Sequence, residues 1–67
     1  MSRYTLAEIK VAAYNWTELP NMTTEERNLW QGLGFVYECY RCGESKELCE
    51  KMAQQYIKIL GRNINHD

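Results

Sequence analysis

Residues 24–61 have the sequence TEERNLWQGLGFVYECYRCGESKELCEKMAQQYIKILG, and the expected fold is built on this segment. Apolar residues recur in it every three or four positions, which is the spacing of one face of an α-helix. Gly43 can adopt the left-handed conformation that ends one helix, and Ser45 can accept a hydrogen bond at the start of the next. We therefore expect a helical hairpin, with helices at 24–42 and 46–60.

A further helix is predicted ahead of the hairpin. Thr5 and Glu8 have the spacing of a capping box, in which each side chain accepts a hydrogen bond from the other's backbone N–H. This helix is expected to span 6–18, because the proline at position 20 disfavours helical geometry at the residue before it. Thr23 and Glu26 repeat the capping box at the start of the hairpin. The predicted fold class is all-α, a small three-helix bundle.

The composition predicts one compact domain. With 67 residues the chain is near the lower limit for a core that folds alone, but 45% hydrophobic residues is too many for a disordered chain. We expect a single helical domain over 1–67, with 62–67 as a frayed tail. The formal charge of −1 and the absence of a basic cluster argue against nucleic-acid binding. No apolar run is long enough for a membrane span, so no membrane association is expected.

Three cysteines form the pattern most suggestive of a metal site. Cys39, Cys42 and Cys49 could converge near the turn, but a closed zinc site needs four ligands. The only histidine, His66, lies beyond the far end of the last helix, on the order of 20 Å away at 1.5 Å per residue. Free cysteine commonly behaves as a small buried hydrophobe, and an odd number fits a reducing compartment. We predict no metal, no disulfide and a cytoplasmic location.

No catalytic set is recognisable in the sequence. No serine or cysteine has an evident base nearby, and no phosphate-binding loop is present, so we expect neither enzymatic activity nor a cofactor. A helix-turn-helix reading of the hairpin remains open, with Gly43 in the turn. Glu47 and Glu50 would then face DNA phosphates at the start of the recognition helix, which would weaken binding.

The first two helices each carry a second apolar stripe that a three-helix core does not need. Such stripes would be exposed on a small monomer. We therefore expect self-association, most simply a homodimer, or contact with another protein. The predicted interface residues are Ala7, Val11 and Tyr14 on the first helix and Gly32, Phe35 and Cys39 on the second.

Leu29–Glu44, LWQGLGFVYECYRCGE, resembles a pattern in small helical proteins encoded by phages and prophages of Gram-positive bacteria. In those proteins an aromatic-rich helix ending in Tyr-x-x-Gly precedes a charged amphipathic helix, as across the Leu29–Leu60 hairpin here. The resemblance implies a virus-encoded accessory protein in the host cytoplasm, of a kind that often binds and blocks host proteins, including defence proteins. It assigns no functional residue.

Together these observations favour a non-catalytic, helical protein-binding module, with an inhibitor of a host defence protein as its narrower form. Three alternatives remain open from the sequence. They are a small DNA-binding regulator, an oligomer that sequesters a small nucleotide, and a structural virion component.

Overall fold

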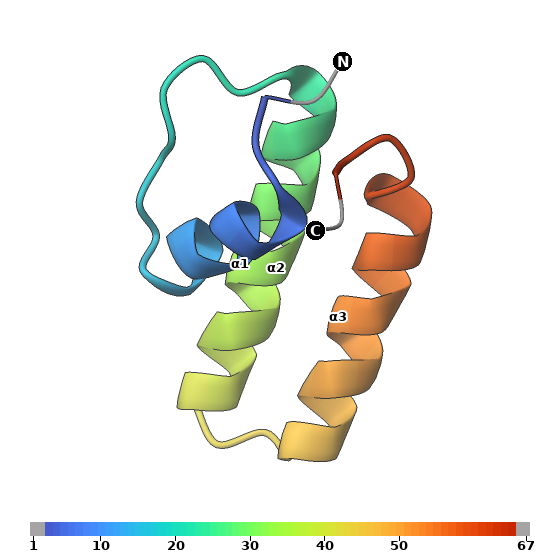
Figure 1. Cartoon of the computed structure of the whole chain (residues 1–67). Helices are drawn as coiled ribbons and strands as arrows, with labels where there is room; N and C mark the ends of the chain where they lie inside the picture. The colour runs from blue at the N-terminus through green and yellow to red at the C-terminus, as the bar shows by residue number, and fades with distance from the viewer. Residues whose placement is uncertain (1–2, 66–67) are drawn as a thin grey trace.

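The computed structural model describes residues 3–65, and over that range it confirms the all-α prediction. The helices are α1 (Leu6–Tyr14), α2 (Thr24–Arg41) and α3 (Lys46–Leu60). α2 and α3 form an antiparallel hairpin, and α1 lies across it near the N-terminal half of α2 (Figure 1). α1 and α3 each pack against α2, which is therefore the central helix of a bundle measuring 34 × 22 × 18 Å. No helix within residues 3–65 is both long and apolar enough to cross a membrane.

The hairpin turn forms as the sequence predicts. Gly43 has a φ of 107°, and its N–H donates to the carbonyl of Tyr40 while the N–H of Glu44 donates to that of Cys39. These two bonds are the Schellman arrangement that satisfies the last carbonyls of a helix. Ser45 then caps α3 by accepting from the N–H of Leu48 at 3.1 Å. α2 ends one residue before the predicted boundary, which is within the usual uncertainty of helix ends.

The predicted end of α1 is wrong. The helix stops at Tyr14 rather than at residue 18, because Trp16 adopts a left-handed conformation with a φ of 51°. The N–H of Trp16 donates to the carbonyl of Ala13 and that of Thr17 to Ala12, which is a second Schellman arrangement. Glycine is the usual residue at this position, since a Cβ there costs about 1–2 kcal/mol. Local sequence therefore gives no sign that the helix ends here.

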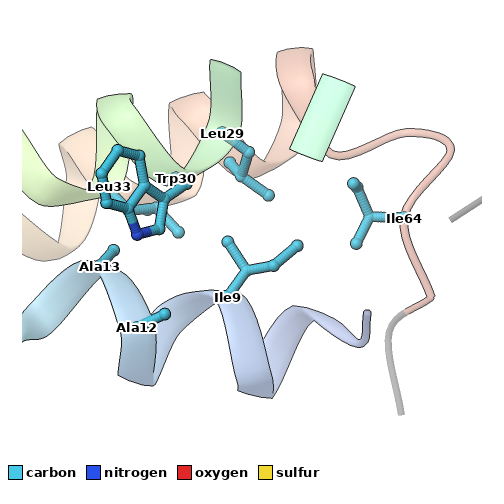
Figure 2. Close-up of a cluster of buried hydrophobic side chains, with 7 residues drawn as sticks. All are labelled: Ile9, Ala12, Ala13, Leu29, Trp30, Leu33 and Ile64. Carbon is cyan, nitrogen blue, oxygen red and sulfur yellow. The ribbon is translucent and has the colours of Figure 1, made fainter. Parts of the chain in front are cut away.

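The hydrophobic core lies between α1 and the N-terminal half of α2 (Figure 2). Two small residues on α1 bring that helix close to α2, and Ile9 fills the space beside Leu29. Core packing of this kind supplies most of the stability of a small domain. The buried cluster consists of Ile9, Ala12, Ala13, Leu29, Trp30, Leu33 and Ile64.

The C-terminal segment is packed rather than frayed, so the prediction for 62–67 is wrong where the structure describes it. Ile64 is only 5% exposed and closes the end of the core. The carbonyl of Asn65 accepts from the N–H of Leu6 at 2.6 Å, and the side chain of Asn63 donates to Glu25 at 2.7 Å. Ile64 therefore packs on the core beside the start of α1, where the Asn65 carbonyl meets Leu6. Residues 66–67, including His66, lie outside the described residues.

Candidate functional site

The structure separates the residues predicted as one interface. Ala7 and Val11 are exposed on α1, where they line a shallow recess with Leu19. Tyr14 lies one turn beyond Val11 on the same side of α1 and is also exposed, with its ring edge-on to that of Tyr37 of α2 at a centroid distance of 5.4 Å. All three residues of the second stripe of the first helix are thus exposed, with Ala7 and Val11 lining this recess and Tyr14 lining a different one.

The stripe predicted on the second helix is also divided. Tyr56 of α3 covers Gly32, because a Cβ added to this glycine would lie 2.7 Å from Cδ1 of the tyrosine ring. Cys39 is half-buried, whereas Phe35 is 66% exposed. Only Phe35 among these three presents a large apolar group to solvent.

Phe35 lies within a group of exposed apolar side chains. Its ring meets that of Trp16 edge-to-face, with 6.3 Å between centroids and 88° between planes. Gly32 lies one turn before Phe35 on α2, so the Tyr56 ring on that glycine lies beside this pair. Tyr56 shares a shallow apolar recess with Ile59. We call the residues Trp16, Phe35, Tyr56 and Ile59 the aromatic face.

A second glycine positions the Trp16 ring. A Cβ added to Gly34 would overlap this ring, lying 2.6 Å from Cζ3. The ring also packs edge-to-face on Trp30 at 5.3 Å, and its Nε1 donates to Oε1 of Glu38 at 3.0 Å. Gly34 therefore lets an indole lie directly against the α2 backbone, and the neighbouring contacts hold the indole there.

Arg41 links the end of α1 to α2. Its guanidinium forms an ion pair with Glu38 at 2.7 Å and donates to the backbone carbonyl of Tyr14. The same guanidinium lies 4.5 Å from the centroid of the Tyr14 ring, within the range of a cation–π contact. Because Glu38 also accepts from Trp16, these contacts fix the chain reversal that carries the indole.

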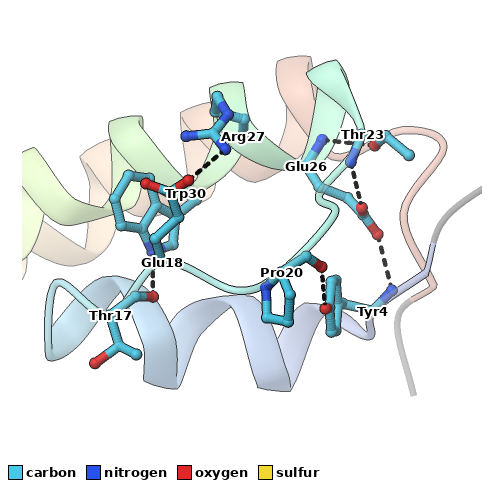
Figure 3. Close-up of polar contacts among 8 residues, drawn as sticks. All are labelled: Tyr4, Thr17, Glu18, Pro20, Thr23, Glu26, Arg27 and Trp30. Carbon is cyan, nitrogen blue, oxygen red and sulfur yellow. Dashed lines mark hydrogen bonds and ion pairs between the residues drawn. The ribbon is translucent and has the colours of Figure 1, made fainter.

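Two further contacts hold the loop between α1 and α2 (Figure 3). Nε1 of Trp30 donates to the carbonyl of Thr17 at 3.1 Å, and Arg27 pairs with Glu18 at 2.7 Å. The hydrogen bond and the charge of Arg27 lower the pKa of Glu18 below its ordinary value. The loop thus follows α2 closely after leaving Trp16.

Glu26 is a fully buried carboxylate that holds the N-terminal segment (Figure 3). Oε2 accepts from the backbone N–H groups of Arg3 at 2.6 Å and Tyr4 at 2.8 Å, and Oε1 accepts from that of Thr23 at 2.8 Å. The Tyr4 hydroxyl also donates to the carbonyl of Pro20. From the sequence, Glu26 was predicted only as part of a capping box. Its hydrogen bonds to Arg3 and Tyr4 depend on the tertiary fold, because these residues are distant from it in sequence.

The cysteines differ sharply in their surroundings. Cys42 is exposed at the turn, Cys39 is half-buried and Cys49 is buried on α3, all as free thiols. Burial raises the pKa of the Cys49 thiol, and the nearby Cys39 and Glu44 charges raise it further. Across residues 3–65 no three histidine, cysteine or acidic side chains are grouped closely enough to hold a metal ion.

These surroundings predict the order in which the thiols react. Thiolate is the nucleophile, so Cys42 should be alkylated by iodoacetamide first and Cys49 last, at least about tenfold more slowly. Timed digestion and mass spectrometry would measure the three rates. Equal rates for Cys42 and Cys49 in the folded protein would contradict the assigned burial.

Joint replacement of the cysteines tests whether they bind a metal. Cys39→Ser, Cys42→Ser and Cys49→Ala together should lower the free energy of unfolding by about 1 kcal/mol through lost packing, with the fold retained. Urea unfolding followed by circular dichroism would measure this loss. Stoichiometric zinc in the unaltered protein, purified without added metal, would contradict the prediction of three unliganded thiols.

The sequence pointed to part of the aromatic face. Phe35 is one of the predicted interface residues, whereas Trp16, Tyr56 and Ile59 are not among them. The available signal was the pair Gly32 and Gly34, because glycine inside a helix is unfavourable and often marks a close approach. Which aromatic rings lie against the two glycines depends on the tertiary structure.

No family model, curated protein or solved structure matches this chain, so the function has to be inferred from its own geometry.

Proposed function

We propose that this chain is a non-catalytic protein-binding module whose aromatic face docks on another protein. The observation that carries the proposal is the exposure of Phe35, which is 66% accessible although it belongs to the central helix. Interfaces take most of their binding energy from a few aromatic anchors surrounded by apolar contacts. Phe35 has this setting, with Trp16 beside it and Tyr56 one turn away.

The geometry of the face favours binding further. Trp16 is held by Trp30, Glu38 and the surface of Gly34, so its ring loses little freedom when a partner arrives. Binding is stronger when the side chains of an interface are already ordered in the free protein. Gly32 and Gly34 each weaken α2 by about 1 kcal/mol relative to alanine, but they leave room for the Tyr56 and Trp16 rings on the helix surface.

The proposal has a specific and a general form. The resemblance of Leu29–Glu44 to phage and prophage proteins supports the specific form, in which the partner is a host protein that the chain inhibits, such as a defence protein. The general form needs only the exposed apolar side chains. These also support pairing of two copies through the aromatic face when no other partner is present, since exposed apolar area favours association.

Replacement of Phe35 tests the general form. Phe35→Ala should lower capture of a bound protein from host lysate at least about tenfold, the loss expected when an aromatic anchor worth about 1.4 kcal/mol is removed. Quantitative mass spectrometry after affinity purification would measure it. Val11→Ala is the matched control, because Val11 is similarly exposed at 63% but lies on α1 outside the aromatic face.

Two outcomes would count against the proposal. If Phe35→Ala and Val11→Ala retain the same proteins in the same amounts, the aromatic face is not the docking surface. The pairing of copies fails separately if light scattering returns the monomer mass at micromolar concentration and above. Circular dichroism of both variants would show that each keeps its helices.

A further inference from the structure

Two cysteines at the end of α2 form a pair that the proposed function does not use. Cys39 and Cys42 are three positions apart, and Cys42 is the C-terminal cap of this helix. Both are free thiols, with Cys42 exposed and Cys39 half-buried. A Cβ added to the next residue, Gly43, would meet no atom within 4 Å. The space beside Cys42 is therefore open to a small molecule.

The spacing of the two cysteines suits a disulfide. In an α-helix, Cα atoms three positions apart are separated by about 5 Å, which lies within the range of about 4.4–6.8 Å found in disulfides. The Cβ atoms of such a pair are about 5–6 Å apart, whereas a disulfide needs about 3.5–4.5 Å. The last turn of α2 must therefore tighten by about 1–2 Å for the two sulfurs to bond.

The end of a helix is where this tightening is easiest. Helix ends readily adopt the tighter 3₁₀ form, in which side chains three positions apart eclipse one another. The N–H of Gly43 already donates to the carbonyl of Tyr40 at 3.1 Å, which is the hydrogen bond of a 3₁₀ turn. The N–H of Cys42 is shared between the carbonyls of Glu38 and Tyr40. A small change in this turn alone therefore brings Cys39 and Cys42 together.

The third cysteine is less suited to react with a dissolved oxidant. Cys49 lies on α3 and is only 6% exposed. Burial and the nearby charges of Cys39 and Glu44 raise the pKa of its thiol, so little of the reactive thiolate is present at neutral pH. Cys39 and Cys42 are thus the two sulfurs that solvent reaches.

We propose that Cys39 and Cys42 are a reversible redox pair, oxidised to an intramolecular disulfide by a small disulfide such as glutathione disulfide. The Cys42 thiolate attacks one sulfur of glutathione disulfide, which forms a mixed disulfide and releases one glutathione thiolate. The Cys39 thiolate then attacks the Cys42 sulfur, and the second glutathione leaves. The two cysteines lose two electrons and two protons, and glutathione disulfide takes them up to give two molecules of glutathione.

The same turn carries contacts of the aromatic face. Glu38 and Arg41 each precede one of the two cysteines, and their side chains form an ion pair at 2.7 Å across this turn. Glu38 also accepts from Nε1 of Trp16 at 3.0 Å. Closing the disulfide repositions both charged side chains, so it alters the contacts that hold the indole. The thiol chemistry stands by itself, whereas regulation of docking by oxidation rests on the proposed function.

Trypsin distinguishes the possible disulfides, because the three cysteines fall on three separate tryptic peptides. These are 28–41 with Cys39, 42–46 with Cys42 and 47–51 with Cys49. The whole protein would be equilibrated with mixtures of glutathione and glutathione disulfide, its free thiols blocked with N-ethylmaleimide, and the digest analysed by mass spectrometry. We expect 28–41 and 42–46 as a disulfide-linked pair, and we expect excess glutathione to restore both thiols.

Matched variants separate this pair from the third thiol. At the glutathione ratio that oxidises half of the Cys39 and Cys42 pair, Cys49 should be oxidised at least about tenfold less, because it is buried. Cys42→Ser should abolish the linked peptides, whereas Cys49→Ala should leave their yield unchanged. Tryptophan emission should change on oxidation of the native protein but not of Cys42→Ser. None of these measurements needs a partner, so their failure is distinct from a failure of docking.

Several results would overturn the inference. Linked peptides 28–41 and 47–51 would assign the disulfide to Cys49 instead. Glutathione retained on Cys42, with Cys39 still blocked by N-ethylmaleimide, would show that the turn does not tighten. Tryptophan emission that does not respond to oxidation would remove the link to the aromatic face. Circular dichroism of each variant establishes that it is folded.

Discussion

Glu26→Gln is expected to lower the free energy of unfolding by about 3 kcal/mol, the range found when a buried charged hydrogen-bond acceptor is lost. Glutamine keeps the shape of glutamate but places an NH₂ group where an acceptor is needed. In the native protein Oε2 accepts from the N–H groups of both Arg3 and Tyr4, and Oε1 accepts from that of Thr23. Whichever way the amide turns, donor faces donor in a site with no solvent exposure.

Glu25→Gln is the matched control for this prediction. Glu25 precedes Glu26 on the same turn of α2 but is exposed, and Asn63 donates to it at 2.7 Å. Its replacement should change the free energy of unfolding by less than about 0.5 kcal/mol, as is usual for surface positions. Urea titrations followed at 222 nm would compare the two variants. Similar losses for both would show that the buried carboxylate does not hold the N-terminal segment.

Gly34→Ala is expected to lower the free energy of unfolding by about 2 kcal/mol, although alanine is the better helix former. The new Cβ would overlap the Trp16 ring, so the indole must leave the surface of α2. Its edge-to-face contacts with Trp30 and Phe35 and its hydrogen bond to Glu38 would be lost with it. Tryptophan emission should shift to longer wavelength as the ring becomes solvated.

A double-mutant cycle isolates this contact. In a Trp16→Gly background the ring is absent, and Gly34→Ala should then stabilise the protein by about 1 kcal/mol through helix propensity alone. The sign of the same substitution would thus reverse between backgrounds, with a coupling energy of about 3 kcal/mol between the two positions. Stabilisation by Gly34→Ala in both backgrounds would mean that the indole does not lie on this glycine.

Proposals about binding depend on the same ring. If Gly34→Ala displaces Trp16, it should also weaken docking through the aromatic face, because Phe35 would lose its neighbouring ring.

Features that depend on near neighbours in the chain could be predicted from the residue types alone. The capping boxes at Thr5 and Thr23, the cap at Ser45 and the left-handed Gly43 all formed as predicted. Each of these depends on hydrogen bonds between residues only a few positions apart, so the local residue types are sufficient. The apolar periodicity of α2 and α3 also predicts which faces of these two helices pack together.

The end of α1 and the exposure of the aromatic rings depend on contacts between distant parts of the chain. Trp16 takes the left-handed conformation because its ring gains contacts with Trp30 and Phe35 of α2, which are distant from it in sequence. Ile64 is buried for a similar reason, since the C-terminal segment returns to the start of α1, where the Asn65 carbonyl accepts from the N–H of Leu6. Periodicity identifies apolar residues but not what covers them, and the covering groups here come from distant parts of the chain.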